Sequence, residues 1–272
     1  MSRGSGPGSP RFLLFQQEGH LIASTLASGL TAARKAHYQD KGSVYVALFN
    51  LATGLERLFK AVVIAEHMAL HALAAPSKKQ LRVYGHDIRG LYDTCVVIGT
   101  KHGHALTPRF EFDALDKGIV DLLSDFGEGA RYHNLDQLGG APAIADPLAR
   151  WAGLLRLAAD DVSDRSKTGI RTCAAATASL MADSTMVIMT GMEGTSLTLT
   201  DVLERPYLHG AAAPHLVWRL VRLIDSFVPV LDSTCRAVNE KAKAALLPVA
   251  MAEFFQWLWA DRAHVLRKRR WP

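Results

Sequence analysis

The sequence predicts an all-α protein, a helical bundle with a helical C-terminal extension and one short β-hairpin. Apolar residues recur at spacings of three and four over 43–74, which is typical of a helix with one buried face. The chain has 272 residues, of which 49% are hydrophobic, so it is long enough to bury a core. Only one short segment alternates with a period of two, which is too little strand for a sheet-based fold.

The first three helices are expected to follow one another closely. Pro10 suits the first turn of a helix that runs to about residue 38, because the missing N–H of proline costs nothing there. The second helix covers 43–74, and Pro76 follows it as a helix breaker. Ser77 and Gln80 then form a capping box, which predicts a third helix that continues to about residue 98.

The middle of the chain is expected to hold two helices on either side of an irregular segment. One helix is strongest over 112–126, and the glycine-rich stretch 127–145 follows it. Asp146 and Pro147 are the N-cap and first residue of the other helix, which we expect to reach at least residue 164.

The last third of the chain changes character before it returns to helix. A helix over 170–182 precedes a run in which Thr alternates with Leu, and residues 186–200 are expected to form a hairpin. Pro206 and Gly210 are expected to end this excursion. Two further helices are predicted, over 214–246 and 248–268.

Charge and cysteine content exclude several classes of protein. The net charge is +5, but the last twelve residues carry +4 of it, so no broad basic face for nucleic acid is implied. The three cysteines lie far apart without a Cys-x-x-Cys pair, which argues against a zinc ribbon and fits a reducing, cytoplasmic compartment. No segment suggests a membrane span, and no cofactor is expected because its usual motifs are absent.

Three polar segments lie among apolar residues and form the candidate site. We expect them to line one groove, in which Arg57, His86 and Arg131 converge with Asp87 or Asn134. The alternative is a surface helix pair with ordinary ion pairs, each worth ~0–1 kcal/mol. The groove residues are Glu56, Arg57, Lys60, His86, Asp87, Arg131, Tyr132, His133 and Asn134.

Two of these segments resemble the HEPN group of helical domains. The matching residues are Gly54-Leu55-Glu56-Arg57-Leu58-Phe59-Lys60 and Tyr84-Gly85-His86-Asp87-Ile88, and the similarity covers about residues 43–136. The resemblance implies a bundle of four or five helices, and many such domains are paired with defence, toxin or nucleotidyltransferase partners. The expected organisation is a flexible tail at 1–9, a HEPN-like bundle at 10–140 and a helical extension at 146–268.

Nuclease members of the HEPN group carry an arginine followed, after four to six residues, by a histidine. The chain has no pair at that spacing. Three residues separate Arg82 from His86 and Arg205 from His209, one separates Arg131 from His133, and nine separate Arg57 from His67. The resemblance therefore implies a non-nucleolytic member, or one with a displaced site.

Asp160, Asp161 and Asp164 match the DDxxD pattern with which prenyl-diphosphate synthases bind magnesium and diphosphate. On a single helix, Asp160 and Asp164 would share one face and could ligate a metal together. The arginine pair expected soon after the pattern is absent, as is a second DDxxD. We therefore expect a solvated helix terminus, late in its helix, that binds no magnesium tightly.

The sequence favours an interaction or regulatory protein rather than an enzyme. A protein partner or a second copy of the chain is expected, and the resemblance alone suggests a link to nucleotide, RNA or defence systems. Two enzymatic alternatives stay open. A metal-dependent prenyl-transfer-like enzyme requires a second acidic cluster that faces Asp160, and an atypical ribonuclease requires an arginine and a histidine that converge in a groove.

Overall fold

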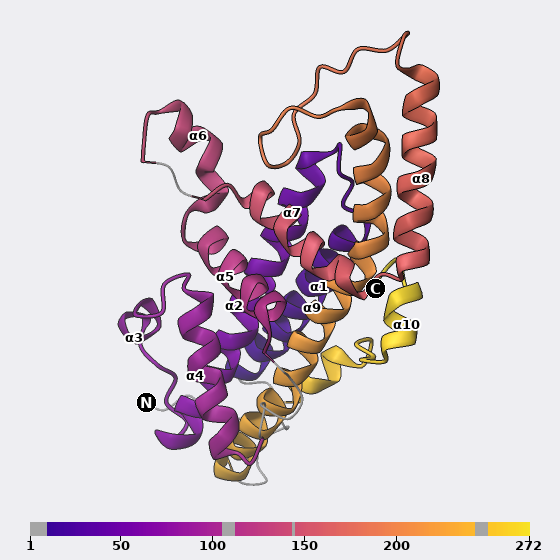
Figure 1. Cartoon of the computed structure of the whole chain (residues 1–272). Helices are drawn as coiled ribbons and strands as arrows, with labels where there is room; N and C mark the ends of the chain where they lie inside the picture. The colour runs from indigo at the N-terminus through magenta and orange to yellow at the C-terminus, as the bar shows by residue number, and fades with distance from the viewer. Residues whose placement is uncertain (1–9, 105–111, 143–144, 243–249) are drawn as a thin grey trace.

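The computed structural model describes residues 10–104, 112–142, 145–242 and 250–272, and these residues form an all-α structure. No strand occurs within these ranges, and none of their helices is long and apolar enough to cross a membrane. The centre of the bundle is formed by α1 (Pro10–Lys35), α2 (Lys41–Leu70) and α9 (Leu199–Ala242) (Figure 1). Because α2 packs against both α1 and α9, the two ends of the chain contribute to one hydrophobic core.

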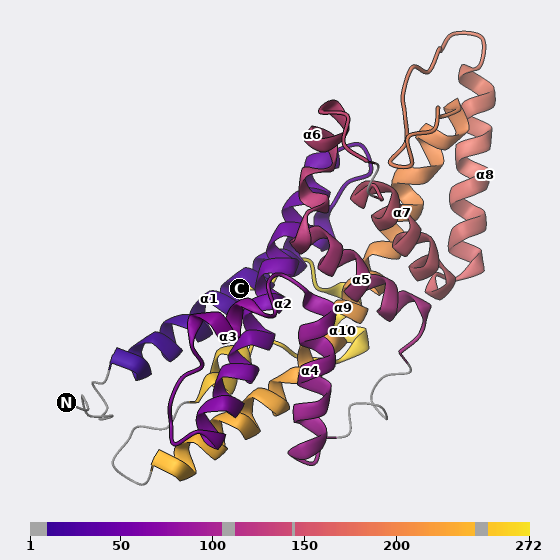
Figure 2. The ribbon, with the colours of Figure 1, turned by 90° about the vertical axis from the view of Figure 1, so that its left-hand side faces the viewer.

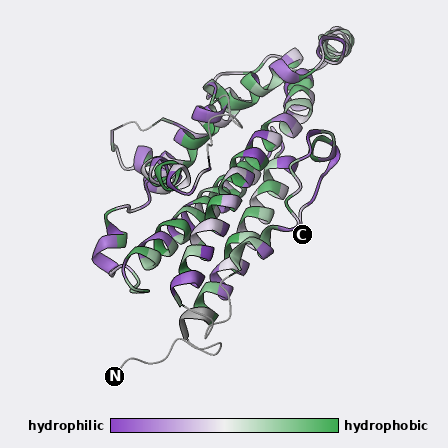
Figure 3. Ribbon diagram, turned by 90° about the horizontal axis from the view of Figure 1, so that it is seen from below, coloured by the Kyte–Doolittle hydropathy of each residue, from purple (hydrophilic) through white to green (hydrophobic). Residues whose placement is uncertain are grey.

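Two glycines allow α1 and α2 to approach each other closely. A Cβ on Gly54 would lie 2.6 Å from Leu26 Cδ2, and a Cβ on Gly29 would lie 2.9 Å from Leu51 Cγ. Leu26 and Leu51 are fully buried at this contact. Figure 3 shows hydrophobic and hydrophilic turns alternating along the helices of the bundle, as expected where one side of each helix faces the core.

The third predicted helix is divided into two. Its capping box is confirmed, since Gln80 N donates to Ser77 Oγ and Ser77 N donates to Gln80 Oε1. The helix that it begins, α3 (Lys78–Arg82), has only five residues, and Gly85 follows it with φ of +49°. Glycine adopts this left-handed conformation without strain, so the chain turns here. Asp87 then caps a new helix, α4 (Ile88–Lys101).

The following segments contain more helix than predicted. The helix α5 (Ala114–Glu128) lies where a helix was expected. The stretch 127–145 was expected to be irregular, but it holds the 3₁₀-helix η1 (Ala130–Tyr132) and the short helix α6 (His133–Leu138). Residues 105–111 and 143–144 lie outside the described residues.

The expected helix from Asp146 begins as predicted but ends early. Asp146 Oδ1 accepts a hydrogen bond from Leu148 N, which confirms the cap of α7 (Pro147–Ala158). The prediction that this helix reaches residue 164 is wrong. The 3₁₀-helix η2 (Ala159–Asp161) follows α7, and Ser163 then caps α8 (Asp164–Met181) by accepting from Ser166 N.

The hairpin predicted over 186–200 is wrong. A single antiparallel bridge joins Thr190 to Ser196 there, and the described residues form no strand. The second arm does not become a strand because Thr198 caps α9. Asp201 N donates to Thr198 Oγ1, and Thr198 N donates to Asp201 Oδ2, so the two residues form a reciprocal cap.

The predicted break at Pro206 and Gly210 is also wrong, because α9 continues through both residues for 44 residues in all. Each proline inside a helix removes one hydrogen bond, but the apolar face of α9 is buried from Ala212 to Val238 and compensates for that loss. The helix predicted over 248–268 is replaced by the 3₁₀-helix η3 (Met251–Phe255) and by α10 (Arg262–Arg267). Residues 243–249 are not among those described.

The position of α8 creates a space at one end of the molecule. It lies beside the N-terminal half of α9, at one end of the molecule (Figure 1, Figure 2). Only Ala174 and Ala178 of α8 are buried. The end of α7, the start of α8 and the first turns of α9 therefore enclose a space at the edge of the bundle.

Candidate functional site

Glu56, Lys60 and His86, three of the predicted groove residues, come together beside α2. Lys60 Nζ donates to Glu56 Oε1 at 2.7 Å and to the Gly85 carbonyl at 2.6 Å, and His86 Nδ1 lies 3.0 Å from Glu56 Oε2. Burial raises the pKa of Glu56, but the hydrogen bonds and charges of Lys60 and His86 lower it more, so the net shift is downward. This cluster holds the turn between α3 and α4 against α2.

Arg57 and Asp87 have other partners. Arg57 Nη2 donates to Glu18 Oε2 on α1 at 2.8 Å. Asp87 Oδ1 accepts from Gly90 N at 2.9 Å as the cap of α4, and from Ser124 Oγ at 3.2 Å. Both residues therefore connect neighbouring helices.

Arg131, Tyr132, His133 and Asn134 form no hydrogen bond or ion pair with the Glu56 cluster among the described residues. The Arg131 guanidinium lies over the Tyr132 ring, 5.1 Å from its centroid. The His86 carbonyl does face Gly127, close to this segment in the chain.

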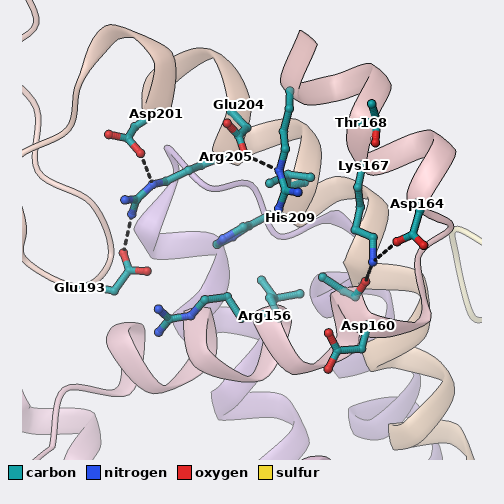
Figure 4. A pocket seen from close by; sticks show the side chains of 14 residues that line it. Arg156, Asp160, Asp164, Lys167, Thr168, Glu193, Asp201, Glu204, Arg205 and His209 are labelled. Atoms are coloured by element: carbon teal, nitrogen blue, oxygen red, sulfur yellow. Dashed lines mark hydrogen bonds and ion pairs between the residues drawn. The ribbon is translucent and has the colours of Figure 1, made fainter. Parts of the chain in front are cut away.

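A cavity of about 570 Å³ lies between α7, α8 and α9 (Figure 4). That volume is typical of a site for a small molecule. Its lining contains four basic and five acidic side chains, so with its histidine neutral it carries one net negative charge. These residues are Arg156, Lys167, Arg171, Arg205, Asp160, Asp164, Glu193, Asp201 and Glu204, and the histidine is His209.

Arg205 is the centre of an ion-pair cluster on one side of the cavity. Its Nη1 donates to Glu193 Oε2 at 3.1 Å and to the Tyr38 hydroxyl at 3.3 Å, and its Nε donates to Asp201 Oδ1 at 3.0 Å. Glu193 is presented by a tight turn that contains Gly194, with φ of +75°. Burial lowers the pKa of Arg205, but Tyr38 and Asp201 raise it more, so the guanidinium is firmly charged.

His209 follows Arg205 by one helical turn and is largely desolvated. The Tyr38 ring packs edge-on against its imidazole with centroids 4.7 Å apart, and Nδ1 is buried without a hydrogen-bond partner among the described residues. Burial lowers the pKa of His209 to about 4, Glu193 opposes the shift, and Arg205 and Arg156 add to it. The imidazole is therefore neutral near pH 7.

Arg156 and Asp160 line the cavity without partners. Arg156 lies in the last turn of α7 and Asp160 in η2, and neither makes a hydrogen bond or ion pair within the part of the chain that the structure describes. In Figure 4, Arg156 extends toward the side of the cavity that holds His209, whereas Asp160 lies on the side of Lys167. The cavity thus contains one free cation and one free carboxylate on different sides.

The aspartates of the DDxxD pattern do not share one helical face. Asp160 and Asp161 lie in η2, and Asp164 is the first residue of α8, so the expectation of a cluster late in one helix is wrong. Asp160 and Asp164 line the cavity, whereas Asp161 Oδ2 lies 3.9 Å from His215 Nδ1 and 3.7 Å from Arg262 Nη2. Across the described ranges, no group of three or more His, Cys, Asp or Glu side chains could hold a metal ion.

The sequence carries one signal for this cavity, which is two pairs of polar residues at positions i and i+4. These pairs are Arg156 with Asp160 and Arg205 with His209. Arg205 and His209 both lie on α9, where this spacing places them one above the other, whereas Asp160 lies in η2, beyond the end of α7. The signal was hidden because residues 186–210 were expected to leave the helix, and because no local pattern shows which helices face one another.

No protein-family model matches the chain, and neither a curated protein nor a solved structure matches it. The site is therefore interpreted from its geometry and chemistry.

Proposed function

We propose that this chain is a non-nucleolytic interaction or regulatory module that binds a small polar molecule in the cavity between α7, α8 and α9. The observation that carries the proposal is the Arg156 guanidinium, which lines a cavity of about 570 Å³ and has no partner among the described residues. Its planar array of donors suits a carboxylate or a phosphate. Neutral His209 beside it offers a further hydrogen-bonding group.

The cavity also explains how binding would be communicated. α8 is attached at this point by Arg171, whose Nε donates to Glu204 Oε1 at 3.3 Å, and by Lys167, whose Nζ donates to the Ala159 carbonyl at 3.4 Å. A molecule that contacts α7, α8 and α9 together adds further links between them. Occupancy therefore stabilises α8 on α9, and a protein partner or second copy recognises the exposed side of α8.

The HEPN-type resemblance supports a link to nucleotide, RNA or defence systems as part of the same proposal. It rests on the segments that contain Glu56, Arg57, Lys60, His86 and Asp87. The helical architecture is compatible with it, but an all-α architecture is shared by many proteins of unrelated function.

An atypical ribonuclease is the second candidate, because Arg156, Arg205 and His209 meet at one cavity. Two features disfavour it. Arg205 is already bound by two carboxylates, and the net negative charge of the lining repels a phosphodiester backbone. With a pKa of about 4, His209 is also a weak base at pH 7. We expect no cleavage of single-stranded RNA, and cleavage that is lost in His209→Ala would establish the nuclease instead.

A prenyl-transfer-like enzyme is not supported by the same cavity. Carboxylates do lie across it from Asp160, but Glu204 is paired with Arg171, and Asp201 is paired with Arg205. A magnesium–diphosphate site needs carboxylates that are free to bind the metal together with separate cations for the diphosphate.

The proposal is tested by screening small polar compounds against the purified chain. The panel contains acetate, butylamine, triglycine, inorganic phosphate and adenosine monophosphate, and binding is followed by thermal shift and by hydrogen exchange of α8. We expect at least one compound to stabilise the protein and to slow exchange in α8, and Arg156→Gln to abolish both effects. Arg165→Gln, at an exposed position on α8 outside the cavity lining, is the matched control. No binding by any compound, or binding that Arg156→Gln leaves unchanged, contradicts the proposal.

A further inference from the structure

The ion pairs of the cavity leave two opposite charges available. Asp164, Glu193, Asp201 and Glu204 each have a basic partner within 3.3 Å, and these partners are Lys167, Arg205 and Arg171. Arg156 and Asp160 have none within the described part of the chain. Both side chains are exposed, so they are open to a ligand that offers one negative and one positive group.

We propose that the cavity binds a short zwitterion of the kind formed by the two ends of a small peptide, with its carboxylate at Arg156 and its ammonium group at Asp160. This inference rests on the proposed function. A guanidinium can hold a carboxylate through two parallel hydrogen bonds, and the three donors of an ammonium group suit a carboxylate acceptor. Each of the two contacts gives a charged partner to an exposed side chain that has none among the described residues.

The arrangement of the lining requires the two charges of the ligand to be separated. Figure 4 shows Arg156 extending toward His209 and Asp160 lying toward Lys167, so the two groups are on different sides of the space. A cavity of about 570 Å³ also has room for more than a single small amino acid. A peptide of two or three residues places its ends apart and fills the intervening space with uncharged backbone.

The charge of the lining disfavours a polyanion in the same place. A phosphate with two or more charges needs several cations, and Arg156 is the one that the described residues leave free. To recruit Arg171 or Arg205, a phosphate would have to break their ion pairs and leave Glu204 or Glu193 without a partner. Removing one partner of such a pair is costly where the other stays partly buried.

Three probes with the same triglycine backbone and different charges at their ends test this inference by titration calorimetry. They are triglycine, N-acetyltriglycine, which lacks the ammonium group, and triglycinamide, which lacks the carboxylate. We expect triglycine to bind about tenfold or more tightly than either analogue, because each analogue loses one charge-assisted contact. Inorganic phosphate is titrated in parallel as the anion that the inference disfavours.

Two substitutions assign the contacts. Asp160→Asn should weaken triglycine about tenfold and leave N-acetyltriglycine unchanged, whereas Arg156→Gln should weaken triglycine and leave triglycinamide unchanged. Asp161→Asn is the matched control, because Asp161 faces His215 and Arg262 instead of the cavity, and it should alter none of the affinities. The comparison of the three probes on the unmodified chain remains decisive if a variant does not fold.

The outcomes separate this inference from the proposed function. If phosphate or a singly charged analogue binds as tightly as triglycine, and Arg156→Gln abolishes that binding, the zwitterion inference is overturned while the binding module stands. Triglycine affinity that Asp160→Asn leaves unchanged overturns the inference as well. If no probe or panel compound binds at all, both proposals fail.

Discussion

Asp160 and Asp161 are adjacent in the chain but contact different surroundings. Asp160 lines the cavity between α7, α8 and α9, whereas Asp161 Oδ2 lies 3.7 Å from Arg262 Nη2 near the C-terminus. Both residues lie in η2, and neighbouring side chains of a 3₁₀-helix point about 120° apart around its axis. A sequence pattern that resembles one metal site therefore serves two separate contacts.

This split predicts weak magnesium binding. Asp161 lies near Arg262, and Asp164 forms an ion pair with Lys167 at 3.1 Å, so the three carboxylates are not arranged to bind one metal ion together. Calorimetry with Mg²⁺, alone and with inorganic diphosphate, should detect no micromolar binding to the unmodified chain. Micromolar binding that is lost in Asp160→Ala would contradict this reading and would favour the prenyl-transfer alternative.

The stability of the fold should decrease at mildly acidic pH because of His209. Its pKa in the folded protein is about 4, against an ordinary value of 6.5. Between these values the unfolded chain binds a proton that the folded chain does not, so the free energy of unfolding falls as the pH falls, by up to about 3 kcal/mol. Urea denaturation at several pH values measures this slope.

The control for that slope is His209→Gln, which removes the titrating group from both states. The free energy of unfolding of the variant should change less between pH 6.5 and pH 4 than that of the unmodified chain. An identical pH dependence in the two proteins would show that His209 does not titrate as the structure requires.

Two Gly→Ala changes, one at the close contact between α1 and α2 and one on exposed α8, are expected to have opposite effects on stability. In Gly54→Ala the new Cβ would meet Leu26, including its backbone N at 3.2 Å, so overpacking should destabilise the fold by ~1–3 kcal/mol. In Gly169→Ala, within α8, no atom lies within 4 Å, and the helix should gain ~0.5–1 kcal/mol. Thermal or urea unfolding of both variants checks the signs, and a stabilising Gly54→Ala would refute this packing.

The Glu56–Lys60 pair should contribute to stability near neutral pH. Glu56→Gln is expected to reduce the free energy of unfolding by about 1 kcal/mol, because Lys60 then holds the Gly85 carbonyl without its ionic partner. The pKa of Glu56 is lowered in the fold, so this contribution is present above pH 4.5 and is lost as the pH falls below that value.

A double-mutant cycle with Lys60→Met measures the Glu56–Lys60 coupling directly. Lys41→Met is the matched control, since Lys41 lies half-buried at the start of the same helix and has no ion pair among the described residues. A coupling energy of zero at pH 7 would mean that the contact does not stabilise the turn between α3 and α4.

Local signals in the sequence were sufficient for much of the fold. The caps at Ser77 and Asp146 and the apolar stripe of α2 depend on neighbouring residues, and the structure confirms them. The passage of α9 through Pro206 depends instead on burial of its later turns, which a local pattern does not show. The break before α8 depended on whether Ser163 would cap a new helix.

The candidate site was harder to predict from the sequence than the fold, because local patterns do not show how distant helices pack. Glu56, Lys60 and His86 were expected together, and they lie on elements that are close in sequence. The cavity joins α7, α8 and α9, so its geometry depends on how three helices pack. Arg156 and His209 acquire their roles only when that packing brings them to one space.

Whether the cavity binds a ligand is tested by an NMR titration of the His209 imidazole with triglycine, acetate and inorganic phosphate in turn. Triglycine should shift the His209 signals in a saturable manner and raise the pKa of His209 above about 4, because the ligand carboxylate at Arg156 adds a negative charge nearby. The signals of His264, which stacks on Trp259 away from the cavity, should not change. His209 signals that stay unchanged with all three compounds would contradict the claim that this cavity is the binding site.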